Sequence, residues 1–146
     1  MNRRLILQSA AASAFAGFIA VASAQSAAPA APQRHKLVLQ VSDAEPAKWN
    51  LALNNARNVQ QDVGAANVDV EIVAYGPGIG MLKRDSVTAN RILDAIQAGV
   101  KVVACENTMQ ALKLTKADMN PAVAYVAAGV SELMTKQAAG WSYVRP

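Results

Sequence analysis

The sequence has almost none of the residues from which disulfides and zinc sites are built. Among its 146 residues, Cys105 is the only cysteine and His35 is the only histidine. A disulfide within the chain is therefore excluded, and a zinc site with the usual cysteine and histidine ligands is not expected. Because His35 stands at the start of the fold, away from any candidate nucleophile, the sequence shows no acid/base catalytic set. We predict neither a metal nor a cofactor.

A large excess of one charge is also absent. The formal net charge is +4, and the basic residues are spread along the chain without a basic run. Nucleic-acid binding, which relies on a basic patch, is therefore not predicted. Charged residues make up only 16% of the sequence, whereas hydrophobic residues make up 53%. This composition is apolar for a small domain, and it favours assembly into an oligomer.

Residues 1–24 have the pattern of a cleaved signal peptide. The basic residues Arg3 and Arg4 precede an apolar stretch, and Ala22-Ser23-Ala24 supplies the small residues that signal peptidase requires. The stretch is too rich in alanine, serine and glycine for a membrane anchor, which needs about 20 strongly apolar residues. We therefore expect a bacterial periplasmic or secreted protein with no membrane span after cleavage. The adjacent arginines leave open whether export follows the general or the twin-arginine route.

The rest of the sequence predicts a linker followed by one domain. Residues 25–34, rich in alanine and proline, are expected to form a disordered linker, and residues 35–146 are enough for a single domain. Strand patterns occur at 36–42, 68–72, 100–104, 121–126 and 141–144, with helix patterns between them. This alternation predicts an α/β fold, a three-layer sandwich with a mostly parallel five-stranded sheet and helices on both faces.

The strand at 68–72 guides the prediction of strand order. Its three apolar residues alternate with Asp69 and Glu71, which we expect to face water as they would on an edge strand. The strand at 100–104 is more continuously apolar and is expected to be more central. For five parallel strands, these features favour the flavodoxin-like order 2-1-3-4-5.

That strand order draws attention to the end of the third strand. Ligands of open parallel sheets bind beyond the carboxyl ends of the strands, where the winding direction reverses. In the order 2-1-3-4-5 the reversal lies between the first and third strands, so Ser42 and Asp43 should lie next to Cys105 and Glu106. The only cysteine is therefore expected in the default binding crevice of the fold.

Two interpretations of Cys105 stay open at this point. A helix that starts at Asn107-Thr108 would direct backbone N–H groups toward the sulfur and lower the pKa of the thiol. Glu106 and Asp43, if close, would act in the opposite direction. A lone cysteine at a strand end can equally be an inert core residue that packs like a small apolar side chain.

A glycine-rich loop follows the second strand. Gly76, Gly78 and Gly80 lack the spacing of the dinucleotide fingerprint, and Lys83 does not follow a glycine as it would in a phosphate-binding loop. A nucleotide site is therefore not predicted. The glycines instead allow a tight turn beside the crevice, and the backbone amides of such a turn can bind a small anion.

Four stretches carry a resemblance to a known family. They are the opening strand, YGPGIGML after the second strand, AGVKVVACENTM around the cysteine and GWSYVRP at the end. On these stretches, the sequence from about His35 to Pro146 resembles the DsrE-like (DsrE/DsrF-like) family of sulfur-relay proteins, in a branch of small exported members. The resemblance implies a three-layer α/β subunit that forms homotrimers or homohexamers. It also implies that Cys105 carries sulfur as a persulfide between a donor protein and an acceptor protein.

Two functional hypotheses follow. The first is an exported sulfur carrier that holds sulfane sulfur as a persulfide on Cys105, at most a sulfurtransferase-type activity. The alternative is a non-enzymatic, oligomeric binding module for a small ligand or anion, in which Cys105 only lines the crevice. Besides Cys105, the residues expected at the site are Ser42, Asp43, Gly76, Gly78, Gly80, Glu106, Asn107 and Thr108.

Overall fold

The computed structural model describes residues 34–146. The predicted signal peptide and residues 25–33 of the predicted linker lie outside the described residues. Arg34, the last residue of that predicted linker, forms an ion pair with Asp69 at 2.8 Å. Within 34–146, no helix has both the length and the hydrophobicity that crossing a membrane requires.

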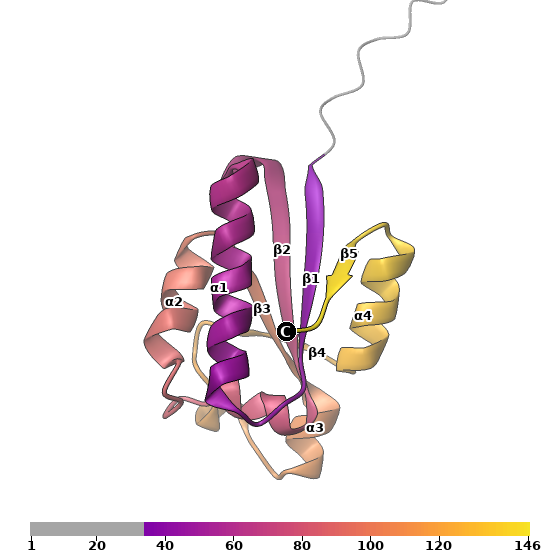
Figure 1. Cartoon of the computed structure of the whole chain (residues 1–146). Coiled ribbons are helices and arrows are strands. Elements are labelled where there is room, and N and C mark those ends of the chain that lie inside the picture. The colour runs from indigo at the N-terminus through magenta and orange to yellow at the C-terminus, as the bar shows by residue number, and fades with distance from the viewer. Residues whose placement is uncertain (1–33) are drawn as a thin grey trace, which may run out of the picture. The chain divides into compact units, whose positions relative to one another are not determined.

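Strands and helices alternate along the chain, as Figure 1 shows. The strands are β1 (His35–Val41), β2 (Val68–Ala74), β3 (Lys101–Cys105), β4 (Ala124–Val126) and β5 (Ser142–Val144). The α-helices are α1 (Pro46–Val63), α2 (Ala89–Gln97), α3 (Glu106–Ala111) and α4 (Gly129–Ala138). Short 3₁₀ helices are η1 (Ala65–Asn67), η2 (Gly76–Leu82) and η3 (Lys116–Asp118).

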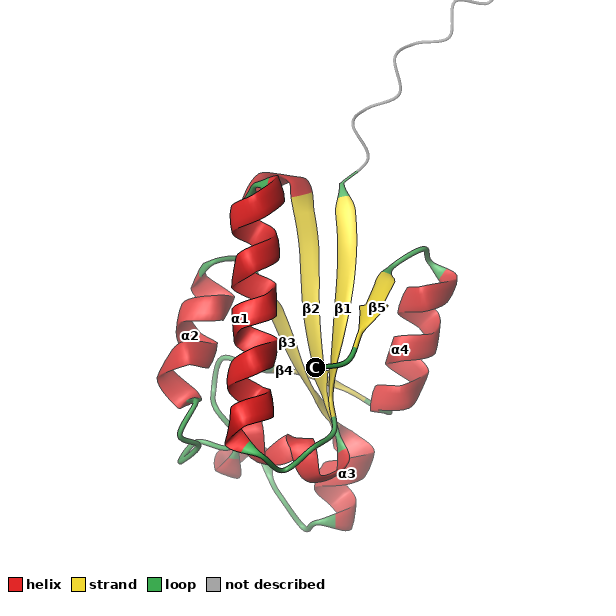
Figure 2. Cartoon of the chain, in the orientation of Figure 1, coloured by secondary structure: helices red, strands yellow, loops and turns green. Residues whose placement is uncertain are grey.

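The five strands form one parallel sheet in the order β4-β3-β2-β1-β5 (Figures 1 and 2). The predicted class, a five-stranded parallel sheet with helices on both faces, is confirmed. The predicted order 2-1-3-4-5 is wrong, because β2 lies between β1 and β3 instead of at an edge. The winding direction therefore reverses between β1 and β5.

This topology explains which helix covers which face. The connections from β1 to β4 all step in one direction across the sheet, and parallel crossovers are right-handed, so α1 and α2 lie on the same face. The last connection returns from β4 to β5, on the far side of β1, and so places α4 on the opposite face (Figure 2). The short helix α3 lies near the carboxyl ends of the strands (Figure 1).

The two faces of the sheet bury very different amounts of apolar surface. The large core lies under α1 and α2, where residues such as Leu39, Ile72 and Ile92 are fully buried. A small cluster lies under α4 and contains Val38, Val73, Val103 and Leu133. Fewer apolar side chains therefore cover the α4 face of the sheet than the face under α1 and α2.

Glu71 is the polar side chain that misled the prediction of strand order. It lies on central strand β2 and is fully buried, although the alternating pattern predicted a water-facing position. Lys136 of α4 and Lys101 of β3 lie against its carboxylate, at 2.7 Å and 3.1 Å. Buried carboxylates require such partners, and Lys136 is far away in the sequence, so the pattern of β2 alone could not reveal this pairing.

Candidate functional site

Cys105 is the last residue of β3 and directly precedes α3. Side chains alternate along a strand, and Val103 belongs to the small cluster under α4, so Cys105 points to the same side of the sheet. Its exposed fraction is only 4%. The thiol is therefore a buried group at the carboxyl edge of the sheet.

Hydrogen-bond donors from two helix starts surround the sulfur. Burial raises the pKa of the Cys105 thiol, but the Thr108 hydroxyl and the backbone N–H groups of Thr108, Gly129 and Asn107 lower it by more. The resulting pKa lies below the ordinary value of 9.0. The contacts differ from a standard N-cap hydrogen bond, since the sulfur is approached from α3 and from α4 together. The arrangement stabilises the thiolate, the form of cysteine that acts as a nucleophile.

The glycine loop fixes the orientation of the Thr108 hydroxyl. The backbone N–H of Gly76 donates a hydrogen bond to Thr108 Oγ1 at 3.0 Å. Because the oxygen accepts this bond, the hydroxyl hydrogen is left to donate to the sulfur of Cys105. Gly76 has a positive φ of 51°, a backbone conformation that favours glycine. The loop thus acts on the thiol through Thr108.

The other two glycines of the loop hold it close to its neighbours. At Gly78, a Cβ atom would lie 2.2 Å from the carbonyl oxygen of Val41, at the end of β1. At Gly80, a Cβ atom would lie 3.2 Å from the ring of Trp49 in α1. Of the three glycines, Gly76 contacts the Cys105 surroundings through Thr108, whereas Gly78 and Gly80 serve close packing against β1 and α1.

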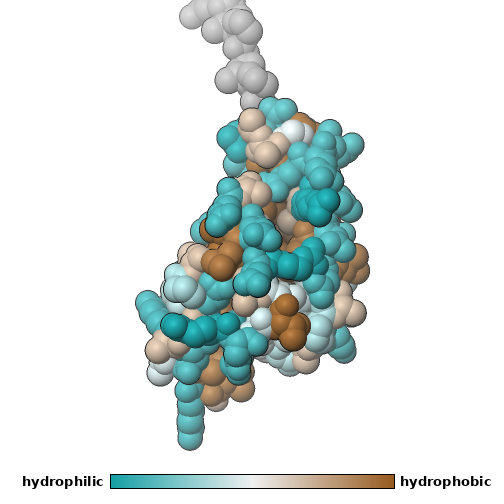
Figure 3. All heavy atoms as spheres, turned by 90° about the vertical axis from the view of Figure 1, so that its left-hand side faces the viewer, coloured by the Kyte–Doolittle hydropathy of each residue, from teal (hydrophilic) through white to brown (hydrophobic). Residues whose placement is uncertain are grey.

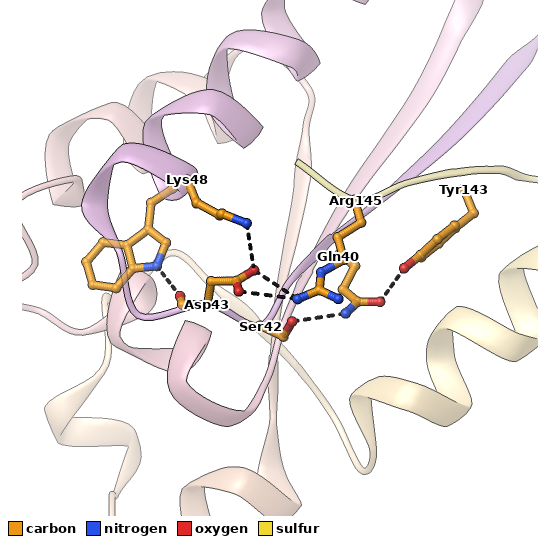
Figure 4. A network of polar contacts seen from close by, with 7 residues as sticks. Gln40, Ser42, Asp43, Lys48, Tyr143 and Arg145 are labelled. Carbon is orange, nitrogen blue, oxygen red and sulfur yellow. Dashed lines mark hydrogen bonds and ion pairs between the residues drawn. The ribbon is translucent and has the colours of Figure 1, made fainter.

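Ser42 and Asp43 do not lie beside Cys105, contrary to the prediction from the strand order 2-1-3-4-5. The intervening strand β2 separates the end of β1 from the end of β3. Both residues instead lie where β1 meets β5, at the actual reversal of the winding direction. Figure 4 shows the polar network at this place.

Asp43 is the centre of one half of that network. Its carboxylate forms ion pairs with Arg145 at 3.2 Å and with Lys48 at 3.7 Å. Its backbone carbonyl accepts a hydrogen bond of 2.7 Å from Trp49 Nε1. The carboxylate is therefore neutralised locally, and its contacts fix the chain between β1 and α1 (Figure 4).

Gln40 organises the other half of the network. Its amide Nε2 donates to Ser42 Oγ at 3.0 Å, and its Oε1 accepts a hydrogen bond from the Tyr143 hydroxyl (Figure 4). These bonds tie the short edge strand β5 to the end of β1. Sequence reasoning did not identify Gln40 or Tyr143, since their pairing follows from the position of β5 beside β1.

Glu106 has a different environment from the one expected. It was predicted to oppose ionisation of the thiol, but its carboxylate lies 3.8 Å from Lys116 Nζ. Neither Glu106 nor Asp43 is among the main groups that shift the pKa of Cys105. The predicted residues that do gather around the thiol are Gly76, Asn107 and Thr108.

Gly129 lies at the thiol, although the sequence analysis did not place it at the site. It is the first residue of α4, and its N–H contributes to the low pKa of Cys105. A Cβ atom at Gly129 would lie 3.0 Å from the side chain of Tyr75, so glycine allows α4 to begin close to the end of β2. The predicted strand order could have indicated this position of Gly129. It places β3 and β4 side by side, so the residues that follow the two strands meet at the same edge of the sheet.

The comparisons with known proteins agree with this architecture. The chain is similar to the structure of MTH1491 from Methanobacterium thermoautotrophicum, a protein of unknown function, with 30% identity over 77% of this chain and 99% of that one and a TM-score of 0.73. It shares its fold with BT1422 from Bacteroides thetaiotaomicron, also of unknown function, at 16% identity, 76% and 94% coverage and a TM-score of 0.63. No protein of curated function matches. A model of the DsrE/DsrF-like family matches residues 19–146, most of the chain, and the protein therefore belongs to the DsrE/DsrF-like family.

Proposed function

We propose that this protein carries sulfane sulfur as a persulfide on Cys105. The observation that carries the proposal is the set of donors around the sulfur, namely the Thr108 hydroxyl and three backbone N–H groups, which favour the thiolate. Membership of the DsrE/DsrF-like family supports it, because that family suggests a sulfur-relay type of fold. Cys105 is the only thiol in the chain, so no other residue can take this role.

The proposed step is an exchange without net oxidation or reduction. The Cys105 thiolate attacks the terminal sulfur of a donor persulfide, R–S–SH, so that one S–S bond forms and one breaks. The products are Cys105–S–SH and the donor thiolate, which takes up a proton from water. An acceptor thiolate then attacks the outer sulfur and releases the Cys105 thiolate. This chemistry requires one nucleophile and a docking partner, and it needs no separate acid/base pair.

The cellular setting is part of the same proposal. The signal-peptide pattern of residues 1–24 supports export to the bacterial periplasm or the exterior, where the donor and acceptor proteins would also be found. The resemblance to the DsrE-like family implies a homotrimer or homohexamer, and the apolar composition, with 16% charged residues, supports assembly into an oligomer. Both statements can be checked on protein from a cell fraction, by its N-terminal sequence and by its sedimentation.

Intact-protein mass spectrometry tests the proposal directly. The purified protein is treated with polysulfide under native conditions and then with dithiothreitol. We expect a gain of one sulfur mass that dithiothreitol reverses and that a Cys105→Ala variant does not show. Because only 4% of the residue is exposed, the reaction should be slower than that of a free thiol with the same thiolate fraction. A gain only after denaturation would contradict the proposal.

The burial of Cys105 favours a second candidate function. In this alternative the protein is a non-enzymatic, oligomeric module for a small ligand or anion, and the cysteine is packing. A Cys105→Ser variant separates the two. Retained assembly and retained binding of a small anion by this variant, together with absence of native sulfur uptake in the parent, would support the binding module.

A Thr108→Val variant tests the role of the hydroxyl at the thiol. The change removes a donor to the thiolate, so the pKa of Cys105 should rise, and the thiolate fraction at neutral pH should fall about tenfold. A more basic thiolate is also more nucleophilic, so the observed alkylation rate should fall by only about threefold. The measurement is the rate of iodoacetamide labelling of the native protein across the pH range from about 5 to 10.

A Thr108→Ser variant is the matched control for this experiment. It keeps the hydroxyl that accepts from Gly76 and donates to the sulfur. Its pH profile should stay close to that of the parent protein. If Thr108→Val leaves the midpoint of the pH profile unchanged, the hydroxyl does not stabilise the thiolate.

A further inference from the structure

A cavity of about 270 Å³ lies between α1 and α2. Its floor contains the buried side chains of Leu53, Ala56 and Val100, which belong to the large core under these helices. Cys105 points to the opposite face of the sheet, so the cavity is separate from the thiol site. Figure 3 looks at this side of the molecule, where hydrophobic residues show between hydrophilic ones.

Small side chains leave this space unfilled. Ala56 of α1, Ala95 of α2 and Ala98 just after α2 line the cavity, and none of them extends beyond its Cβ atom. The cavity opens to solvent, because Arg57, Asp94 and Ala98 of its lining are exposed and Ala95 is half-buried. An apolar ligand placed between the two helices would therefore displace water from the apolar lining.

Polar side chains bridge α1 and α2 at two separate levels of the gap. The Arg91 guanidinium of α2 donates to Asn54 Oδ1 of α1 at 2.7 Å and also to Asn50. Nearer the ends of both helices, Gln60 Nε2 donates to the carbonyl oxygen of Ala98 at 2.8 Å. These bridges set the separation of the helices independently of apolar packing, so the cavity does not close by simple collapse.

The charges around the cavity favour an anion. Arg57 and Arg91 contribute two positive charges to its wall, and Asp94 contributes one negative charge. The partners of Arg91 are neutral amides, so its charge is not cancelled. Among residues 34–146, Arg57 takes part in no ion pair. The wall therefore has a net charge of one positive unit above an apolar floor.

We propose that this cavity binds a small organic monoanion with an unbranched apolar body. The carboxylate would lie between Arg57 and Arg91, and the apolar body would lie against Ala95 and Ala98, above the buried floor. A volume of about 270 Å³ holds roughly ten non-hydrogen atoms, because one water molecule occupies about 30 Å³. Octanoate, a saturated carboxylate, has this size. Pockets with an apolar lining and a few convergent polar groups are the usual form of small-molecule sites.

Titration with sodium octanoate tests the proposal, with 1-octanol as the neutral comparison. Amide chemical shifts of the purified protein are followed during each titration. We expect saturable changes at Leu53, Ala95 and Val100 with a Kd on the order of 1 mM for octanoate, as a ligand of about ten atoms allows. Changes confined to the surroundings of Cys105 would overturn the proposal, and so would the absence of saturation.

Three variants separate the contributions of volume and charge. Ala95→Leu fills the cavity from a half-buried position, so octanoate affinity should fall at least about tenfold while the protein stays folded. Arg57→Gln should weaken octanoate about threefold and leave 1-octanol unchanged, since an exposed charge contact contributes little. Arg84→Gln, outside the cavity wall, is the matched control and should change neither affinity.

Two further outcomes would overturn the proposal. Equal affinity of the parent protein and the Ala95→Leu variant would show that octanoate binds elsewhere. Should Ala95→Leu fail to fold, Ala98→Leu fills the same wall from an exposed position and gives the same comparison. Shifts of the cavity amides with protein concentration alone, without octanoate, would assign the gap to contact with a second copy of the chain.

Discussion

A Gly78→Ala variant is expected to lose about 3 kcal/mol of folding free energy, which corresponds to a fall in Tm on the order of 10 °C. The added Cβ would lie 2.2 Å from the carbonyl oxygen of Val41 and 2.9 Å from the Cα of Ser42. Both contacts are with backbone atoms at the end of β1, which cannot move aside as a side chain can. The same carbonyl accepts a hydrogen bond of 3.1 Å from the Tyr75 N–H, so displacement of η2 would also strain that bond.

The neighbouring glycines are matched controls for Gly78→Ala. An added Cβ at Gly80 would lie 3.2 Å from the movable Trp49 ring, and one at Gly76 would have no neighbour within 4 Å. The φ of 51° at Gly76 costs an alanine about 1 kcal/mol of backbone strain. We therefore expect Gly76→Ala and Gly80→Ala to cost about 1 kcal/mol each in urea or thermal unfolding. A Gly78→Ala variant no less stable than Gly80→Ala would show that η2 is not packed tightly against β1.

A Glu71→Gln variant is expected to lose about 3 kcal/mol of folding free energy at neutral pH. The Glu71 carboxylate is fully buried, with Lys136 Nζ at 2.7 Å and Lys101 Nζ at 3.1 Å from the same oxygen, Oε2. Neither contact has the angles of a hydrogen bond, and Oε1 has no hydrogen-bond partner among residues 34–146. The contacts are therefore ionic, and removing the negative charge leaves Lys136, beside the Trp141 ring, with Glu132 at 3.6 Å as its remaining ion-pair partner.

The same variant should change how stability depends on pH. Burial raises the pKa of Glu71, but the contacts with Lys136, Glu132 and Lys101 together outweigh it, so the pKa lies below its ordinary value of 4.5. Between these two values the unfolded chain binds more protons than the folded protein. The contribution of Glu71 is thus complete above about pH 4.5 and is lost as the pH falls through the folded-state pKa. Urea unfolding of the parent protein between about pH 3 and 7 should show this loss, and Glu71→Gln should reduce it.

A double variant shows whether the ion pair is needed for stability. Glu71→Leu/Lys136→Met replaces the two charges in closest contact by apolar groups and leaves Lys101 and Glu132, which are partly exposed, in place. A buried pair exchanged in this way is often neutral or stabilising. We expect the double variant to be more stable than Glu71→Gln. If Glu71→Gln and the parent protein have the same acid profile, the pKa of Glu71 is the same in the folded and the unfolded protein, and the lysines do not favour its charged form.

The elements of the fold were predictable because each depends on a local pattern. Pro46 and Gly64 bound α1 as predicted, and the strand-helix alternation correctly indicated a parallel sheet. The strand order was not predictable from alternation alone. Glu71 reads as a solvent-facing residue until Lys136 of α4 is placed against it, and that contact depends on the order itself.

Only the part of the candidate site that lies close to Cys105 in the sequence was predictable. Asn107 and Thr108 follow Cys105 closely in the chain, so their donors reach the sulfur whatever the strand order. Ser42 and Asp43 were assigned to the same crevice through the strand order, and the assignment failed with it. Gly129 comes from a neighbouring strand connection, which requires the sheet to be assembled first.

Because the Gly129 N–H helps to lower the pKa of Cys105, the acidity of this thiol depends on how much of the chain has been synthesised. The ribosome releases β3 and Cys105 before α4, which starts only after β4. Until α4 docks, the sulfur lacks one of the two helix starts that surround it in the folded protein. The nascent chain therefore exposes a thiol that is less acidic than the finished one. Full acidity of Cys105 arises only when Gly129 and α4 have docked, so chains that end before α4 would have a less acidic cysteine.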